Sequence, residues 1–421
     1  MFSNLLENKK ILVVVTGSIA IYKSLELIRE FIKSNAQVKV LMSKASKKFI
    51  TPLTFEAISQ NEVLHDKSES WVNDNNHVAI AKWADIIVIA PATINAINKL
   101  SNGIADELYL QAIIASNRPK ILAPAANTIM YQNQITQNSL KMLKLFDYTV
   151  VEPIEKLLAC NDRGIGALAE IKDIFFATSK ALLKDEYWVN RRVVVSGGGS
   201  IERIDDVRFI SNFSSSKMAH YLSLALYLKG ADVCLVSTKI LDFLPSSIHT
   251  ILVESSNEML EYLQDALNIA KKGILTKATL MDNSAVTLIQ KKPYLFMSSA
   301  ISDYVPKYPQ SGKIKKSDIG DSWNLELKRN IDILSSLNKD GVFSVGFKAE
   351  MDEENGLLNA KNMLKSKNLD AICFNDVSKN SFGSDENEIV LILKDKEVKL
   401  EKNSKLNISF EILKNLKIDC D

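Results

Sequence analysis

The sequence ILVVVTGSIAIYK occupies residues 11–23 and joins an apolar run to a small polar turn. Its first five residues are valine, isoleucine or leucine, which is typical of a strand buried on both faces of a parallel sheet. After the turn, Leu25, Ile28 and Ile32 recur at helical spacing. This strand–turn–helix unit predicts an α/β fold, in which ligands bind at the edge where the parallel strands end.

The alternation of strand and helix continues along the chain and starts again near residue 188. The predicted strands are residues 11–15, 38–42, 86–90 and 120–123 in the first part, and 193–195, 232–236, 295–298, 342–346 and 371–374 in the second, with a terminal hairpin at 389–393 and 397–400. We therefore expect two doubly wound, Rossmann-like α/β domains, residues 1–188 and 189–421.

The composition agrees with two soluble domains. The chain has 421 residues, which is too long for one ordinary core. It contains 52 basic and 50 acidic side chains, and 46% of its residues are hydrophobic. The near-neutral net charge means that the chain has no large excess of positive charge to attract nucleic acid or an anionic membrane, so we expect neither as a partner. Four cysteines without a CxxC pair argue against a disulfide framework or a zinc site, and favour a reducing cytoplasm.

Polar loops follow the predicted strands of the first domain. Residues 16–18, Thr-Gly-Ser, open a helix, where backbone N–H groups and a hydroxyl suit a phosphate, although many such turns use Gly and Ser for geometry alone. Residues 91–95, Pro-Ala-Thr-Ile-Asn, bring small and amide-bearing side chains to the end of the third strand. Thr93 and Asn95 are also common helix caps, so both interpretations stay open.

His77 and Cys160 are the candidates for proton transfer. An imidazole exchanges a proton near neutral pH, but a lone histidine is more often structural. Cys160 lies in a glycine-rich stretch, residues 158–166, where a thiol is accessible, whereas most cysteines are buried as small apolar side chains.

Together these segments resemble the flavin-dependent cysteine decarboxylases, specifically the phosphopantothenoylcysteine decarboxylase half of the bifunctional coenzyme A biosynthesis proteins. The matching motifs are TGSIA with Lys23, His77 with WAD at 83–85, PATIN with GIAD at 103–106, PAAN at 124–127 and LAC at 158–160. The resemblance implies bound FMN. Its phosphate is expected near Gly17, Ser18 and Ile19, and the rest of the cofactor near Ser43, Thr93 and Asn95.

The resemblance also implies catalytic roles for three residues. His77 assists oxidation of the substrate thiol by the flavin, which gives a thioaldehyde that loses carbon dioxide easily. Asn127 holds the substrate carboxylate, and Cys160 returns a proton to the enethiolate while the electrons return from the flavin. Two positions depart from the family pattern: Ala126 stands where Met is usual, and Ala167 stands where Arg is usual.

The second domain offers candidates for nucleotide chemistry. Its Gly-rich turn, residues 197–200, is not a P-loop, because no Gly-Lys-Ser/Thr follows it. Asp303 ends an apolar strand, where its oxygens could hold Mg²⁺. The basic run GKIKK at 312–316 could neutralise a triphosphate, with Lys313 at the α-phosphate, although a lysine run is usually a solvated face.

These segments are similar to the CTP-dependent phosphopantothenate-cysteine ligases that are fused to the decarboxylase in many bacteria. The shared motifs are GGGS at 197–200, DVRFISN at 206–212, SAISD at 299–303, KIKK at 313–316, VGFKAE at 345–350 and NDV at 375–377, followed by Phe382. The resemblance implies an acyl-cytidylate formed from 4′-phosphopantothenate and CTP, then aminolysis by cysteine. The implied residues are Asp303 and Lys313 for the first step, Asn212 for the second, and Arg329, Asn330, Ile331, Asp332, Phe347, Lys361 and Lys365 for the nucleotide; Ile331 stands where the family usually has Pro.

We therefore predict a bifunctional coenzyme A biosynthetic enzyme that ligates cysteine to 4′-phosphopantothenate and then decarboxylates the product to 4′-phosphopantetheine. One alternative is an oxidative decarboxylase of peptide C-terminal cysteines, which would not need the second domain. Another is a regulatory flavoprotein module, which would need neither His77 nor Cys160. The resemblance implies trimeric flavin domains and dimeric ligase domains, hence a large homo-oligomer such as a dodecamer.

Overall fold

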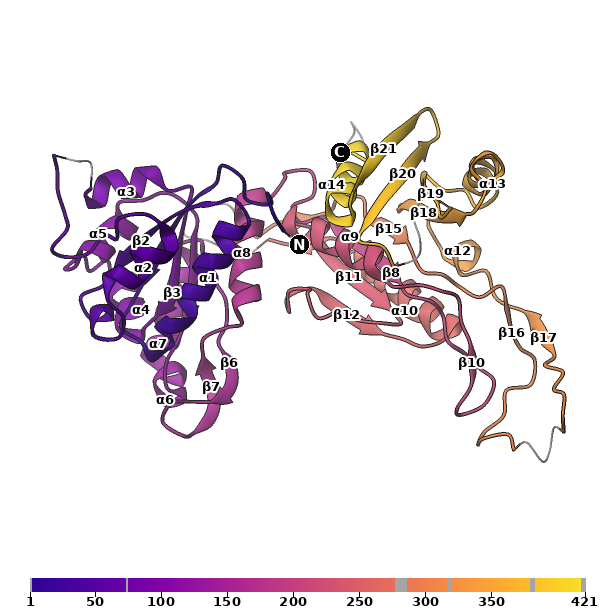
Figure 1. Cartoon of the computed structure of the whole chain (residues 1–421), viewed down its shortest axis with the longest axis horizontal. Coiled ribbons are helices and arrows are strands. Elements are labelled where there is room, and N and C mark those ends of the chain that lie inside the picture. Colours follow the sequence, from indigo (N-terminus) through magenta and orange to yellow (C-terminus); the bar gives the residue numbers. More distant parts are fainter. Residues whose placement is uncertain (1, 73–74, 277–285, 316–319, 379–382, 418–421) are drawn as a thin grey trace. The chain divides into compact units, whose positions relative to one another are not determined.

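The computed structural model describes residues 2–72, 75–276, 286–315, 320–378 and 383–417. These residues form two compact units, the first from residues 2–183 and 286–287 and the second from residues 184–276 and 288–417 (Figure 1). Each unit has its own sheet and its own apolar core. Lys316 and Phe382, which belong to two of the ligase-like motifs, lie outside the described residues.

The first unit is built on a five-stranded parallel sheet in the order β2–β1–β3–β4–β5. The strands are β1 (Lys10–Val15), β2 (Gln37–Met42), β3 (Ile86–Ala92), β4 (Lys120–Pro124) and β5 (Tyr148–Val150). Val13 of β1 pairs with Val40 on one side and Val88 on the other, so the first apolar run forms an interior strand as predicted. The strand order reverses between β1 and β3, and ligands bind at the carboxyl edge of such a switch point.

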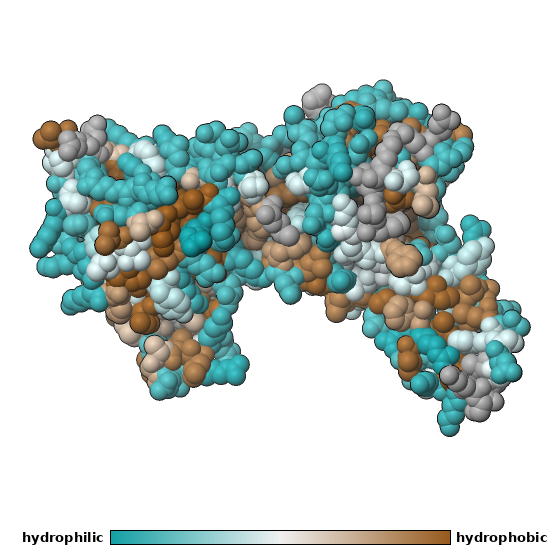
Figure 2. Space-filling view, in the orientation of Figure 1, coloured by the Kyte–Doolittle hydropathy of each residue, from teal (hydrophilic) through white to brown (hydrophobic). Residues whose placement is uncertain are grey.

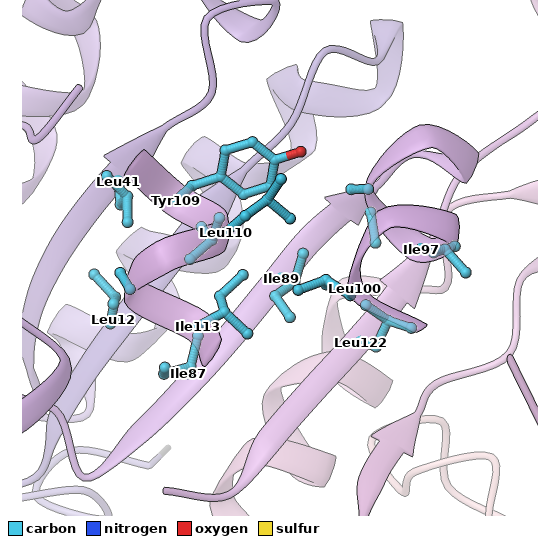
Figure 3. Close-up of a cluster of buried hydrophobic side chains, with 14 of the residues drawn as sticks. Leu12, Leu41, Ile87, Ile89, Ile97, Leu100, Tyr109, Leu110, Ile113 and Leu122 are labelled. Carbon is cyan, nitrogen blue, oxygen red and sulfur yellow. The ribbon is translucent and has the colours of Figure 1, made fainter. Parts of the chain in front are cut away.

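Helices connect these strands and cover the sheet. They are α1 (Tyr22–Lys33), α2 (Pro52–Ser59), α3 (His77–Trp83), α4 (Ile94–Ser101), α5 (Leu108–Ile114), α6 (Thr128–Gln132), α7 (Gln134–Leu145) and α8 (Ile171–Leu183), with 3-10 turns η1 (Ile19–Ile21) and η2 (Ser46–Lys48). Because side chains alternate along a strand, Leu12, Ile89 and Leu122 point to one face of the sheet. There they pack against Leu100 of α4 and Ile113 of α5 (Figure 3).

The second unit has an eight-stranded sheet in the order β12–β11–β8–β15–β18–β19–β20–β21. The strands are β8 (Arg192–Gly197), β11 (Asp232–Ser237), β12 (His249–Leu252), β15 (Tyr294–Met297), β18 (Phe343–Glu350), β19 (Ala371–Asp376), β20 (Glu386–Leu393) and β21 (Glu397–Ser404). The six strands from β12 to β19 are parallel, and β20 and β21 form the antiparallel terminal hairpin that the sequence predicts. The α/β class expected for both domains is therefore confirmed.

The described residues of the second unit include the helices α9 (Lys217–Leu228), α10 (Ser256–Ala270), α12 (Ile333–Ser336), α13 (Glu353–Ser366) and α14 (Lys405–Asn415). Met259 and Leu263 of α10 and Leu364 of α13 pack with Val194 and Leu295 of the strands in one buried cluster. α10 begins with a capping box, in which Ser255 and Glu258 satisfy each other's backbone N–H groups. The predicted helix at Met218, Leu222 and Leu226 is α9.

Small hairpins leave the two sheets and were not predicted. They are β6 (Ile154–Leu157) with β7 (Arg163–Ala167), β9 (Glu202–Arg203) with β10 (Phe209–Ile210), β13 (Ile274–Leu275) with β14 (Leu288–Ile289), and β16 (Tyr304–Pro306) with β17 (Leu327–Arg329). The β6–β7 turn carries Cys160, and the loop between β16 and β17 carries Lys313. Within the described ranges, none of the helices has the length and apolar character needed to cross a membrane.

Candidate functional site

The loops after β1 and β3 are tied together at the carboxyl edge of the first sheet. The buried hydroxyl of Thr16 donates to the carbonyl oxygen of Pro91 at 2.7 Å and accepts from the amide of Thr93 at 3.0 Å. One side chain therefore fixes both loops at the point where the strand order reverses. The structure thus brings the Thr-Gly-Ser turn and the Pro-Ala-Thr-Ile-Asn loop to one edge, as the strand pattern predicts.

The residues expected near the cofactor phosphate lie at the start of η1. A Cβ on Gly17 would lie 2.6 Å from the Cβ of Ala45, so glycine lets the loops after β1 and β2 approach closely. The Ser18 hydroxyl accepts from the amide of Ala20 at 3.2 Å and so caps the turn, while the Ile19 side chain is exposed. These backbone and hydroxyl groups at a helix start suit an anion, as the sequence indicates.

Three further predicted residues lie on the same edge. Ser43 follows β2, is buried, and accepts from the amide of Ser46 at 3.2 Å. Thr93 caps α4 by accepting from the amide of Ala96 at 3.4 Å, and Asn95 in the first turn of α4 is exposed. Thr93 therefore has the capping role left open by the sequence, and its location at the ligand edge is compatible with both interpretations.

A cavity of about 570 Å³ opens beside this edge. Its lining comes from the turn that leads into α1, from the β4–α6 turn and from the β6–β7 hairpin: Ser18, Ile19, Ala20, Tyr22, Lys23, Ala125, Ala126, Asn127, Lys156, Leu157, Leu158, Ala159, Cys160, Gly166, Ala167 and Leu168. The two positions that depart from the family pattern, Ala126 and Ala167, are both in this lining.

Asn127 and Cys160 meet inside this cavity. The Asn127 side-chain nitrogen donates to Cys160 Sγ at 3.3 Å, and the thiol donates to the Asp162 carboxylate at 3.3 Å. Cys160 is exposed, as a reactive thiol requires. The structure therefore places a carboxamide and an accessible thiol within contact of each other on one wall of the cavity.

Two glycines hold the hairpin against the β4–α6 turn. A Cβ on Gly164 would lie 2.3 Å from Thr128 Oγ1, and a Cβ on Gly166 would lie 2.2 Å from the carbonyl oxygen of Ala126. The Ala126 amide also donates to the Gly166 carbonyl oxygen at 2.9 Å. The glycines in the Cys160 stretch thus allow close backbone packing that sets the position of the thiol.

His77 begins α3 and has a separate environment. Its Nδ1 lies 2.8 Å from Glu69 Oε1, and its ring contacts the edge of Trp71 with centroids 5.6 Å apart. The pairing of Ser70 with Asn75 brings Glu69 and His77 together, and Asn76 caps the helix. His77 does not belong to the described residues that line the Cys160 cavity.

A second cavity, of about 430 Å³, lies at the carboxyl ends of β15 and β18 in the second unit. Its lining contains Asp303 and five of the seven residues implied for the nucleotide: Arg329, Asn330, Ile331, Asp332 and Phe347. Residues far apart in the sequence therefore line the same cavity. Asp303 is exposed.

The turn at Asn330 is held by side-chain hydrogen bonds. Asn330 donates from its side-chain nitrogen to the carbonyl oxygen of Ser302 at 2.7 Å and from its amide to that of Asp303 at 2.8 Å. Its Oδ1 accepts from the Ser256 hydroxyl at 3.1 Å. These bonds restrict the turn even though Ile331 stands where the family usually has proline.

Lys367 contributes a cation to this cavity that the sequence reasoning missed. Its Nζ lies 3.0 Å from Asp332 Oδ2. Burial alone would raise the pKa of Asp332, but hydrogen bonds from Lys367 and Ser335 outweigh it and hold this pKa below its ordinary value. Lys361 and Lys365 do not line the cavity in the described structure, and Lys361 pairs with Glu397 at 2.7 Å.

Asn212 lies on the loop between β10 and α9, and Lys313 lies on the loop between β16 and β17. The Asn212 side-chain nitrogen donates to the carbonyl oxygen of Ile301, a residue of the cavity lining, at 3.0 Å. Lys313 is exposed, and the backbone beside it is held by Asp206, which accepts from the Gly312 amide at 2.7 Å. Neither residue belongs to the described lining, but Asn212 is bonded to a residue that does.

The family model described as Flavoprotein matches residues 2–183, and that described as DNA/pantothenate metabolism flavoprotein C-terminal domain matches residues 188–279 and 271–418. The coenzyme A biosynthesis bifunctional protein CoaBC of Bacillus subtilis is 34% identical over 421 residues, covering 98% of this chain and 97% of that protein. The protein of the same name from Haemophilus influenzae is 36% identical over 420 residues, covering 98% of each.

Solved structures also match parts of the chain. The C-terminal domain of a CoaBC protein is 28% identical with a TM-score of 0.41, over 55% of this chain and 96% of that one. A PPC decarboxylase mutant complexed with pantothenoylaminoethenethiol is 31% identical with a TM-score of 0.37, over 41% of this chain and 97% of that one.

Proposed function

The chain belongs to the family of coenzyme A biosynthesis bifunctional proteins, which joins a flavoprotein decarboxylase to a ligase, and from this we propose how its residues divide the two reactions. We assign residues 1–188 to phosphopantothenoylcysteine decarboxylation and residues 189–421 to the CTP-dependent ligation. The observation that carries the proposal is the presence on one chain of both the Asn127–Cys160 cavity and a cavity formed by Asp303 and residues 329–332.

We propose FMN as the flavin of the first unit. The donor set at the sheet edge supports this choice, because it consists of hydroxyls and helix-start amides, which suit a phosphate and the polar edge of a ring. Gly17, Ser18 and Ile19 would hold the phosphate, and Ser43, Thr93 and Asn95 the rest. When bound, the cofactor supplies reversible two-electron oxidation of the substrate thiol.

The residues of the chain supply binding and proton transfer. The Asn127 carboxamide would bind the substrate carboxylate that leaves as carbon dioxide. His77 would take the thiol proton during oxidation. Cys160 would then donate its Sγ proton to the enethiolate carbon, and the contact of the thiol with Asn127 at 3.3 Å supports a shared position near that substrate group.

In the second unit, the carboxylate of 4′-phosphopantothenate would attack the α-phosphorus of CTP, which releases pyrophosphate and gives the acyl-cytidylate. The amino group of cysteine would then attack the acyl carbon and release CMP, with Asn212 serving this step. Asp303 would hold Mg²⁺ together with the phosphates of the nucleotide, which is the usual way in which this ion is bound beside a triphosphate. Lys313 would neutralise charge at the α-phosphate.

The nucleotide itself would lie against Arg329, Asn330, Ile331, Asp332 and Phe347. For the lysine contact we propose Lys367 in place of Lys361 and Lys365, because only Lys367 of the three belongs to the described cavity lining. Its ion pair with Asp332 keeps its ammonium beside the turn at residues 329–332.

We also propose that copies of the chain associate, through trimers of the first unit and dimers of the second. The first unit exposes Ile129, Met130 and Ile135 around α6 and α7, and the hairpins of the second expose Phe209 and Tyr308; Figure 2 shows apolar patches in both regions. Exposed apolar patches of this kind mark association surfaces. A trimer would let His77 of one copy complete the cavity of another. The cysteine pattern supports the cytoplasm as its location.

The experiment that tests the proposed function follows both reactions together. The purified protein should be yellow with bound FMN, and 4′-phosphopantothenate, cysteine, CTP and Mg²⁺ should give equal amounts of pyrophosphate and carbon dioxide. Omission of 4′-phosphopantothenate should abolish both products, and Lys313→Gln should lose pyrophosphate release. A colourless protein after addition of FMN, or pyrophosphate release without 4′-phosphopantothenate, would contradict the proposal.

A further inference from the structure

Ser302 is a buried polar residue in the wall of the second cavity that no role described so far uses. Only 3% of its surface is exposed, and it belongs to the cavity lining. Its hydroxyl oxygen is buried and has no hydrogen-bond partner among the residues that the structure describes. Such a hydroxyl carries a desolvation cost that a hydrogen bond normally offsets, so an unpaired one in a cavity wall points to a missing partner.

The backbone around Ser302 is already fixed by other residues. The Ser302 amide donates to the Ser200 hydroxyl at 3.1 Å, and the Ser302 carbonyl oxygen accepts from the Asn330 side chain at 2.7 Å. Both backbone polar groups are thus satisfied, and the side-chain hydroxyl is the polar group of this residue left without a described partner. A change in the backbone of Ser302 that brought its hydroxyl to a distant acceptor would therefore break these two hydrogen bonds.

A second serine of the cavity lining has a hydrogen-bond partner for its hydroxyl. Ser299 also lines the cavity, and its hydroxyl lies 2.9 Å from that of Ser196. Of these two serines of the cavity lining, Ser299 therefore has a hydroxyl that is bonded within the protein, and Ser302 has one without a described partner.

We propose that the Ser302 hydroxyl forms a direct hydrogen bond with the bound CTP and thereby contributes to recognition of the nucleotide. This inference rests on the proposed function of the cavity. A serine hydroxyl can both donate and accept, so it matches the phosphate oxygens and the polar edges of a cytidine nucleotide alike. Binding of the nucleotide then satisfies a group that the nucleotide-free protein leaves unpaired.

The test compares Ser302→Ala with Ser344→Ala. Ser344 is also buried, but its hydroxyl donates to Asp370 at 3.3 Å, and it lies outside the cavity lining. Calorimetric titration with CTP and Mg²⁺, without 4′-phosphopantothenate, gives the affinity, and thermal melting of the nucleotide-free proteins gives the Tm. Ser302→Ala should weaken CTP binding about five- to tenfold while its Tm stays equal or rises, because removal of an unpaired hydroxyl costs the free protein nothing. Ser344→Ala should lower the Tm.

The CTP affinity and the Tm together distinguish a failure of the Ser302 inference from a failure of the proposed function. Equal CTP affinity in the wild type and Ser302→Ala would overturn the inference, because the hydroxyl then makes no bond with the nucleotide. A loss of affinity accompanied by a fall in Tm as large as that of Ser344→Ala would also overturn it, because the hydroxyl then acts through the fold. Failure of the wild type to bind CTP would instead contradict the proposed function.

Discussion

Cys160 is the residue whose substitution separates the two halves of the decarboxylation. Because the proposed role of its thiol is to protonate the enethiolate, Cys160→Ser should still oxidise and decarboxylate the substrate once. We expect about one carbon dioxide per bound flavin and then no further turnover, since the electrons cannot return. Rapid-quench measurement of carbon dioxide per flavin checks this. Multiple turnovers at the wild-type rate would remove Cys160 from the mechanism.

Lys367 is the residue for which the structure and the sequence reasoning give different expectations. If its ammonium contacts the nucleotide, Lys367→Gln should weaken CTP binding by about tenfold, because a hydrogen bond to a charged group is lost. Lys361→Gln and Lys365→Gln should have smaller effects. Titration of the three variants with CTP distinguishes the lysines. A larger loss in Lys361→Gln would instead support Lys361 as the lysine that contacts the nucleotide.

The β6–β7 hairpin is an element whose position depends on charge as well as on glycine packing. Lys156 Nζ lies 2.5 Å from Glu170 Oε1, and this hydrogen bond holds the pKa of Glu170 below its ordinary value. Because the pKa is lower in the folded than in the unfolded protein, the pair stabilises the hairpin at neutral pH. That contribution is lost as the pH falls through the lowered pKa of Glu170.

Hydrogen exchange of the hairpin amides checks this element. Protection of residues 154–167 should fall between neutral pH and about pH 3 in the wild type, because the Glu170 carboxylate becomes protonated. Lys156→Met should already show the lower protection at neutral pH and should change less with acid. The amides of β1 and β3 provide the control within the same unit. Equal hairpin protection in both proteins at neutral pH would show that the ion pair does not hold the hairpin.

At the level of elements, the sequence predicts the strands and helices that have a long apolar run or a regular apolar spacing. Long apolar runs such as those of β1 and β3 were found because strands buried on both faces carry such a run. The edge strands β5 and β12 were missed because they have only three and four residues, of which several are exposed. The β6–β7 and β16–β17 hairpins lie outside the main sheets and lack the apolar face that a pattern could detect.

The lysines in and next to α13 show that residue spacing does not predict which face of a helix meets a cavity. Met363 of α13 and Lys367, the residue that follows the helix as its C-cap, line the cavity and are four residues apart, so they lie on the same side of the helix end. Lys361 and Lys365 have the same spacing but are displaced by two residues, which is a rotation of about 200° around the axis. Spacing alone predicts a pair of residues on one face, whereas only the packed structure shows which face meets the cavity.

At the scale of the whole molecule, the separation of His77 from the Cys160 cavity predicts a site shared between copies. If His77 of one copy serves the cavity of another, then His77→Asn and Cys160→Ser should each be inactive alone but should restore activity when coexpressed with different tags. Random mixing leaves about a quarter of the shared sites with both residues intact. We therefore expect carbon dioxide release at about a quarter of the wild-type rate per flavin.

The control for this whole-molecule prediction uses two residues from one cavity. Asn127 and Cys160 contact each other within a single chain, so coexpression of Asn127→Ala with Cys160→Ser cannot create a cavity that has both residues intact. This mixture should remain inactive, whereas the mixture of His77→Asn with Cys160→Ser should recover activity. If neither mixture recovers activity although the purified material contains both tags, the shared site is wrong, and His77 must act within its own chain or not at all.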